Sequence, residues 1–391
     1  MKTFKYQIAL LGRPWFDEDV LTAEIARQFE AIGISNSEYV ILSEADIASR
    51  NRGGPFVAAF LGYQGAASAD HPALAELIDD SMPIIPCVSD LDGYRAQVPL
   101  ELAAINGLAI GDVTHLEISR LVSCIFENLS LLRTERRVFI SYRRADTREI
   151  ALQLYDALQG RSFDTFLDTH SIQPAVDMQD HLWHRLADSD VVILLDSPDF
   201  RSSRWTLEEQ ARANSTSVQI LHLLWPNVDE DPYSAFSEFH KLKSADFHAL
   251  GEVGPTARLK DQTIADICVR VESVRAHALA LRYAYLVDQF CDLCRDTGIP
   301  VTVHPERYVS TDKNGVIEIF VPAVGVPNAY RIHQIENAIQ NNQPSSRRVS
   351  VVFDNRGLLK GWVSHIDWLN SHLKVRSLAA TGLQSYVESL A

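Results

Sequence analysis

Apolar residues in the first third of the chain alternate between short uninterrupted runs and longer helical stripes. The short runs have the length of buried strands and occupy residues 7–11, 39–42, 55–61 and 83–88. Between the first two runs, residues 20–32 place Leu21 and Phe29 on one helical stripe, and further helices are predicted at 72–77 and 101–105. This alternation predicts a mostly parallel sheet that is covered by helices on both faces.

The middle of the chain repeats the alternation after a helix at 116–132 and a charged run at 133–137. The pattern predicts strands at residues 138–140, 163–167 and 191–195 and a helix at 205–213. An acidic loop at 227–232 follows, and residues 236–250 are predicted to form a loop with a helix.

The last part of the chain begins with a long helical pattern at residues 260–288. Strands are predicted at 301–303, 316–321 and 349–353, and helices at 362–373 and 383–390. We therefore predict an α/β fold in three segments. They are an N-terminal α/β domain at 1–132, a central domain at 136–228 that extends to about 255, and a C-terminal α/β domain at 258–391.

The composition narrows the class of protein. A formal charge of −15 over 391 residues argues against nucleic acid as a direct partner, because phosphate binding requires a basic surface. No stretch approaches the ~20 apolar residues that span a bilayer, and the apolar run at 8–12 is too short for a secretory signal. Five scattered cysteines fit a reducing compartment, so we expect a cytoplasmic protein without a membrane partner.

Polar side chains follow the strands of the central segment. Residues 141–144, Ser-Tyr-Arg-Arg, come directly after the first strand, Asp168 follows the second, and Asp196 follows the third. In an open α/β sheet the ligand crevice lies outside the carboxyl ends of the strands, and adjacent arginines suit a diphosphate. On the helix predicted next, Trp205 and Glu209 are four residues apart and share a face.

Three stretches of this segment together resemble a Toll/interleukin-1 receptor (TIR) domain of the NAD-consuming kind. They read RVFISYRR at 137–144, DSDVVILLDSP at 188–198 and SSRWTLEEQARA at 202–213. The resemblance implies a flavodoxin-like fold with a parallel sheet and a catalytic Glu four residues after Trp, which selects Glu209. The neighbouring Glu208 would face about 100° away on a helix.

The same resemblance implies a binding site for NAD⁺ as substrate, with no cofactor and no metal. The implied binding residues are Ser141, Tyr142, Arg143, Arg144, Asp168, Ile172 and Trp205. The family's BB loop corresponds to residues 168–178, which lack the glycine often found there. A neighbouring subunit completes the site in this family, so the resemblance also implies self-association and antiphage defence through NAD⁺ depletion.

The chemistry is compatible with one carboxylate. The nicotinamide of NAD⁺ is already a cationic leaving group, so cleavage of the glycosidic bond needs no general acid, and its transition state resembles an oxocarbenium ion. Three alternatives remain open. The domain could be a non-catalytic scaffold or signalling adaptor, or a synthase of a cyclic ADP-ribose messenger, and Tyr142 and Trp205 could simply belong to the core.

The flanking segments give weaker signals. One interpretation of the N-terminal segment is a decayed copy of the central fold: an ungapped alignment places residues 81–85 under 189–193 and Glu101 under Glu209. The other is an unrelated parallel α/β domain that packs, or that binds a nucleotide signal or an activating protein. In the C-terminal segment, we expect Cys291 and Cys294 to be a helical thiol pair rather than a zinc site.

Overall fold

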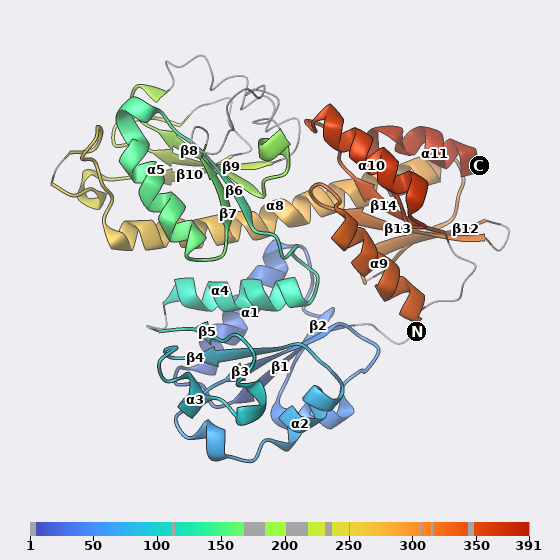
Figure 1. Cartoon of the computed structure of the whole chain (residues 1–391), viewed down its shortest axis with the longest axis horizontal. Helices are drawn as coiled ribbons and strands as arrows, with labels where there is room; N and C mark the ends of the chain where they lie inside the picture. The colour runs from blue at the N-terminus through green and yellow to red at the C-terminus, as the bar shows by residue number, and fades with distance from the viewer. Residues whose placement is uncertain are drawn as a thin grey trace. The chain divides into compact units, whose positions relative to one another are not determined.

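The computed structural model describes most of the chain in two compact units (Figure 1). The described residues are 5–111, 114–167, 184–200, 218–230, 237–249, 251–304, 306–313, 316–342 and 348–390. The first unit comprises Met1–Thr134 and the second Glu135–Ala391.

The first unit is a parallel sheet covered by helices. Its strands are β1 (Tyr6–Gly12), β2 (Tyr39–Leu42), β3 (Phe56–Leu61), β4 (Ile84–Val88) and β5 (Leu108–Ala109), in the order β2-β1-β3-β4-β5. Its helices are α1 (Glu18–Ala31), α2 (Pro72–Asp79), α3 (Tyr94–Gln97) and α4 (His115–Asn128). All residues of β3 are buried, which explains why that strand reads as an uninterrupted apolar run. The helix predicted at 101–105 is instead a 3₁₀ turn at Leu100–Leu102.

The second unit opens with another parallel sheet. Its strands are β6 (Arg137–Ser141), β7 (Asp164–Leu167), β8 (Val191–Asp196), β9 (Gln219–Leu224) and β10 (Glu238–Lys241), in the order β10-β9-β8-β6-β7, and α5 spans Arg144–Gln159. The prediction for 236–250 was wrong, because this stretch contains β10 and a 3₁₀ turn at Ser244–Asp246. β10 is an edge strand that pairs with β9 alone among the described strands, so its residues are largely polar and give no apolar signal.

The two parallel sheets share one topology. In each sheet, the strand that comes second in sequence lies at one edge. The first, third, fourth and fifth strands follow it across the sheet in that order, which is the flavodoxin-like order. The predicted α/β fold class is therefore confirmed. The alignment of residues 81–85 with 189–193 was wrong, because it places β4, a fourth strand, on β8, a third strand. Successive strand–helix units have similar patterns, so an ungapped comparison can slip by one whole unit.

A third sheet completes the second unit. It is formed by β11 (Val301–His304), β12 (Tyr308–Lys313), β13 (Val316–Ala323), β14 (Arg348–Phe353) and β15 (Arg376–Ala379), in that order. The first three strands are antiparallel, and β13, β14 and β15 are parallel. The helices are α9 (Ala329–Asn342), α10 (Lys360–His372) and α11 (Leu383–Leu390).

One long helix belongs to both sheets of the second unit. Helix α8 spans Asp261–Asp296, eight residues beyond its predicted end at 288. Ile267 and Val271 lie in the core of the β6–β10 sheet, whereas Leu286 and Phe290 lie in the core of the β11–β15 sheet. The helix therefore contributes to two hydrophobic cores, and Figure 1 shows it running from one sheet to the other.

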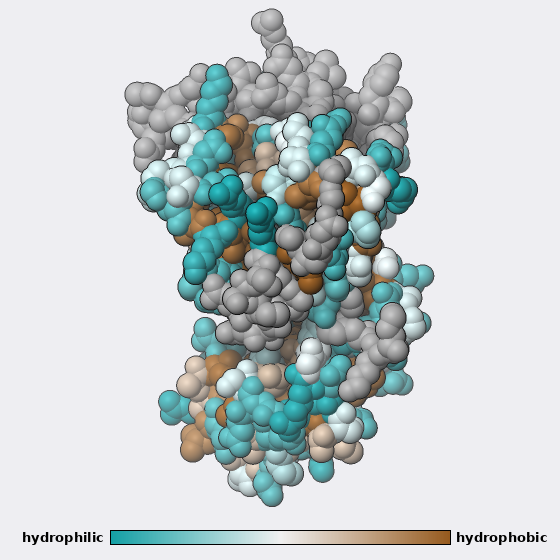
Figure 2. All heavy atoms as spheres, turned by 90° about the vertical axis from the view of Figure 1, so that its right-hand side faces the viewer, coloured by the Kyte–Doolittle hydropathy of each residue, from teal (hydrophilic) through white to brown (hydrophobic). Residues whose placement is uncertain are grey.

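No helix among the described residues is both long enough and apolar enough to cross a bilayer. On the face shown in Figure 2, hydrophilic side chains are interspersed with hydrophobic ones. Isolated exposed apolar side chains of this kind are normal on protein surfaces.

Candidate functional site

The candidate site lies at the carboxyl edge of the β6–β10 sheet. The strand order reverses between β6 and β8, because β6 leads to β7 on one side and β8 leads to β9 on the other. Ligands of open α/β sheets bind at such a reversal. Ser141 ends β6 and Asp196 ends β8, and the two strands are direct neighbours, so the sequence correctly placed both residues at this edge.

Arg143 is held by carboxylates of the same edge. It is the N-cap residue of α5, and its Nη1 donates to Asp146 Oδ2 at 2.8 Å and lies 3.1 Å from Asp199 Oδ2. The Oγ of Ser197 donates to the same Asp146 oxygen at 3.1 Å. The hydrogen bond to Asp146 raises the pKa of Arg143, and Asp199 adds to the effect. A phosphate at Arg143 would therefore compete with two carboxylates.

The other three predicted residues of this edge differ in their exposure. Tyr142 is buried in the core that surrounds β6 and β8, and its side chain is 5% exposed. Ser141 is buried, and its Oγ has no hydrogen-bond partner among the described residues. Arg144 is exposed at the start of α5. Arg144 is therefore the most exposed of these three residues.

A buried Asp–His pair lies beneath the same edge. His222 Nδ1 is 2.7 Å from Asp196 Oδ2, the ring of His222 stacks on Phe239 with centroids 4.9 Å apart, and both members of the pair are buried. The Nε2 of His222 is buried and has no hydrogen-bond partner within the part of the chain that the structure describes. The sequence analysis missed His222 because it stands inside the apolar run of β9, where a lone His looks like a core residue.

The remaining predicted site residues are Asp168, Ile172, Trp205 and Glu209, and they lie outside the described residues, as does Glu208. Their roles stay predictions. Within the described residues, no group of three or more His, Cys, Asp or Glu side chains is arranged to hold a metal ion.

The parallel sheet, its order and its polar carboxyl edge define a flavodoxin-like α/β domain. Residues 138–259 match the family of TIR domains, and the match ends two residues before α8 begins. The chain therefore carries a TIR domain that contains β6 to β10, and the suspected resemblance is confirmed at the level of the domain.

Comparisons of the whole chain are much weaker. No curated protein matches the sequence. Tagatose-6-phosphate ketose/aldose isomerase from Escherichia coli is 12% identical, with 72% of this chain and 82% of that chain covered and a TM-score of 0.19. Protein VC1899 from Vibrio cholerae is 11% identical, with 100% and 91% covered and a TM-score of 0.23. Similarities at this level support no conclusion about fold or activity.

Proposed function

We propose that the TIR domain cleaves NAD⁺ to nicotinamide and ADP-ribose, or to a cyclic isomer, when the protein self-associates in the cytoplasm. The observation that carries the proposal is the pair Trp205 and Glu209, which lies four residues apart inside the stretch that matches TIR domains. Depletion of NAD⁺ during phage infection is the biological role that we propose for this reaction.

Glu209 has the chemistry that the bond cleavage requires. As nicotinamide leaves, positive charge develops on the ribose, and a nearby carboxylate stabilises it because the attraction is strong in a site that excludes water. Trp205 offers an aromatic face for the nicotinamide or adenine ring. Arg144, a predicted ligand of the diphosphate, is exposed at the carboxyl edge of β6, and a guanidinium suits phosphate oxygens.

One observation favours the alternative of a non-catalytic scaffold. Arg143, a predicted diphosphate ligand, is already paired with Asp146 and Asp199. A TIR domain that acts only as a scaffold binds no diphosphate, so Arg143 could keep both of its carboxylate partners. The proposal of catalysis therefore relies on Glu209 rather than on Arg143.

The experiment measures nicotinamide release by concentrated full-length protein, with Glu209→Ala as the variant and Glu208→Ala as its matched neighbour. We expect Glu209→Ala to lower the rate by on the order of 10²-fold or more, as loss of a group that stabilises transition-state charge does. We expect Glu208→Ala to retain activity within about threefold, because on the helix predicted from the sequence that side chain would face about 100° away from Glu209.

The proposal fails if wild-type protein, concentrated enough to self-associate, releases no nicotinamide. It also fails if Glu209→Ala remains fully active. Size-exclusion chromatography of each variant separates a loss of chemistry from a loss of assembly. Chromatography of the released sugar nucleotide distinguishes ADP-ribose from a cyclic isomer, and hence a hydrolase from a synthase of a messenger.

A further inference from the structure

The C-terminal sheet contains a strand arrangement that is typical of nucleotide-binding folds. β13, α9, β14, α10 and β15 follow one another along the chain, and the three strands are parallel neighbours in that order. This is the arrangement of a mononucleotide-binding half, in which the ligand lies outside the carboxyl ends of the strands. The C-terminal sheet therefore has a carboxyl edge of its own, apart from the one in the TIR domain.

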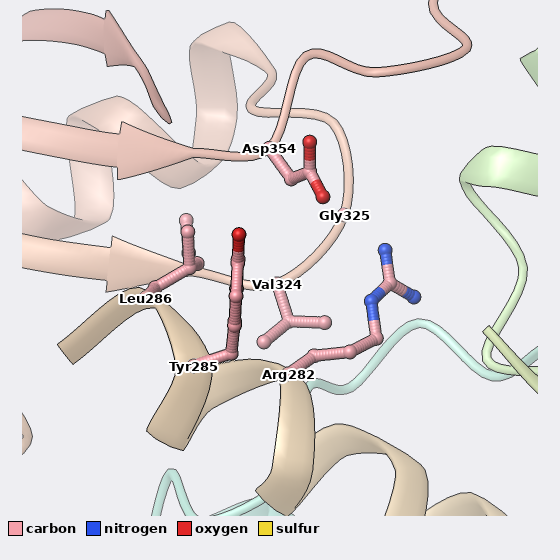
Figure 3. Close-up of a pocket in the computed structure, with 7 residues that line it drawn as sticks. Arg282, Tyr285, Leu286, Val324, Gly325 and Asp354 are labelled. Atoms are coloured by element: carbon pink, nitrogen blue, oxygen red, sulfur yellow. The ribbon is translucent and has the colours of Figure 1, made fainter. Parts of the chain in front are cut away.

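A small pocket lies at this edge (Figure 3). It is lined by Arg282, Tyr285, Leu286, Ala323, Val324, Gly325 and Asp354. Gly325 is in the turn after β13 and has a φ of 91°, a conformation that favours glycine. Asp354 directly follows β14. A glycine after the first strand and an acidic residue after the second are two of the positions that contact the ligand in such folds.

The side chains of the pocket suit a ribonucleotide. Figure 3 shows Tyr285 projecting from α8 toward the strand ends, with the carboxylate of Asp354 turned toward the same space. Tyr285 is 45% exposed and offers a ring face to a base, while a carboxylate at the position of Asp354 accepts hydrogen bonds from ribose hydroxyls. We propose that this pocket binds the ribose of a ribonucleotide through Asp354.

Arg356 is the protein's own competitor for this carboxylate. Its Nε lies 2.9 Å from Asp354 Oδ1 and 3.0 Å from Oδ2, and its guanidinium lies 5.4 Å from the centre of the Tyr285 ring. A ribonucleotide displaces the guanidinium of Arg356 from both groups, while the backbone N–H of Arg356 still donates to Asp354 Oδ1 at 3.0 Å. The freed guanidinium is then a donor for the phosphate. The described strands of this sheet form one such half and not two, so a mononucleotide fits the site better than a dinucleotide.

The pocket is connected to the TIR domain by two of its walls. Arg282 donates through Nη1 to Ser189 O at 2.9 Å and through Nη2 to Ala187 O at 3.1 Å, just before β8 begins. The N–H of Val326, next to Gly325, donates to Asp188 Oδ1 at 3.0 Å. The pocket is therefore in direct contact with the segment that leads into β8, whose other end carries Asp196 at the candidate site.

The test is calorimetric titration of full-length protein with AMP and with 2′-deoxy-AMP. We expect AMP to bind at least tenfold more tightly, because only AMP presents both ribose hydroxyls to Asp354. Asp354→Asn should lower the affinity for AMP at least tenfold and remove the preference over 2′-deoxy-AMP. Asp367→Asn, an exposed carboxylate of α10, is the matched control and should bind as wild type does within twofold.

Tyr285→Ala is the second variant. It is needed because Asp354 also forms an ion pair with Arg356, so substitution of Asp354 can unfold the domain. Removal of this half-exposed ring should weaken AMP binding several-fold without loss of the folded state. The proposal is overturned if wild-type protein does not bind AMP at 1 mM (roughly the weakest useful affinity). Equal affinity of the wild type and a folded Asp354→Asn variant also overturns it, because AMP then binds elsewhere. Neither outcome depends on whether the TIR domain cleaves NAD⁺.

Discussion

Arg275 of α8 and Asp190 at the start of β8 form an ion pair whose two side chains are fully buried, with Nε and Oδ2 2.9 Å apart. The same Asp190 oxygen accepts a hydrogen bond from the backbone N–H of Arg137 at 3.1 Å. A second buried pair joins Arg136 and Glu272 at 2.7 Å. These contacts fix the middle of α8 to the amino ends of β6 and β8, at the edge of the TIR sheet opposite the candidate site.

Replacement of one partner of this pair should be costly. Arg275→Met leaves the carboxylate of Asp190 buried without its counter-charge, so we expect a loss of about 3–5 kcal/mol in the free energy of unfolding. Urea denaturation followed by circular dichroism measures the loss. The double variant Arg275→Met/Asp190→Asn should recover part of it, because the neutral amide removes the unpaired buried charge while its oxygen can still accept from the backbone N–H of Arg137.

The control for this prediction is another arginine of the same helix. Arg295 pairs with Asp292 at 2.5 Å, but the two side chains are 74% and 62% exposed. Exposed ion pairs contribute less than about 1 kcal/mol to stability, so the free energy of unfolding of Arg295→Met should be close to that of wild type. If Arg275→Met and Arg295→Met have equal free energies of unfolding, the buried pair does not anchor α8 to the TIR sheet.

The pairing of Arg143 leads to a prediction about NAD⁺ affinity. Asp199 is 72% exposed and shares the guanidinium of Arg143 with Asp146. Asp199→Asn removes one competing carboxylate, so a diphosphate should gain at most about 1 kcal/mol from Arg143, or roughly a fivefold lower KM. Steady-state nicotinamide release measures KM and kcat separately. An unchanged KM would show that Arg143 does not contact the diphosphate.

The sequence predicted the fold best where strands are buried on both faces. β3 and β8 appear as uninterrupted apolar runs because every residue of each strand is buried. β10 was missed because Glu238, His240 and Lys241 stand on an edge strand, where partial exposure removes the apolar pattern. The length of α8 was underestimated because its buried face changes from one sheet to the other, and no single stripe continues along it.

For the candidate site, the sequence predicted the location at the carboxyl edge of the sheet but not the side chains that pair there. Ser141 and Asp196 follow apolar strands, and the carboxyl ends of parallel strands meet at one edge. The electrostatic partners were not predictable in the same way. Asp146 is three residues from Arg143 on α5 and could have been anticipated, but Asp199 approaches through the fold from a different loop. The pairing of Asp196 with His222 likewise joins two strands that periodicity alone does not place in register.

The shared topology of the two parallel sheets gives a prediction for Glu101. This residue lies in a 3₁₀ turn after β4, a fourth strand, whereas Glu209 follows β8, a third strand. Glu101 is exposed and does not occupy the position equivalent to Glu209. Glu101→Ala should therefore release nicotinamide at the wild-type rate, within about twofold, and unfold within about 0.5 kcal/mol of wild type. A large loss of nicotinamide release in Glu101→Ala would contradict this prediction and show that Glu101 is needed for activity.

The C-terminal sheet should lose stability in alkali through Tyr386. Its hydroxyl donates to Glu318 Oε2 at 2.8 Å, and burial together with this hydrogen bond raises the pKa of Tyr386 to about 12. The ordinary value is about 10. Since the folded state holds the phenol proton more tightly, the stabilisation is fully present below pH ~10 and is lost as the pH rises toward ~12.

Tyr386→Phe separates this effect from the alkaline titration of other groups. The variant should be less stable than wild type at pH 8, because Glu318 loses a hydrogen-bond donor. Its stability should fall less steeply than that of wild type between pH 10 and 12, because phenylalanine has no hydroxyl that ionises in this range. Urea midpoints across this range, with Tyr330→Phe as the control for a 69% exposed tyrosine, measure both slopes. Equal slopes for wild type and Tyr386→Phe would show that the hydroxyl of Tyr386 titrates alike in the folded and unfolded states.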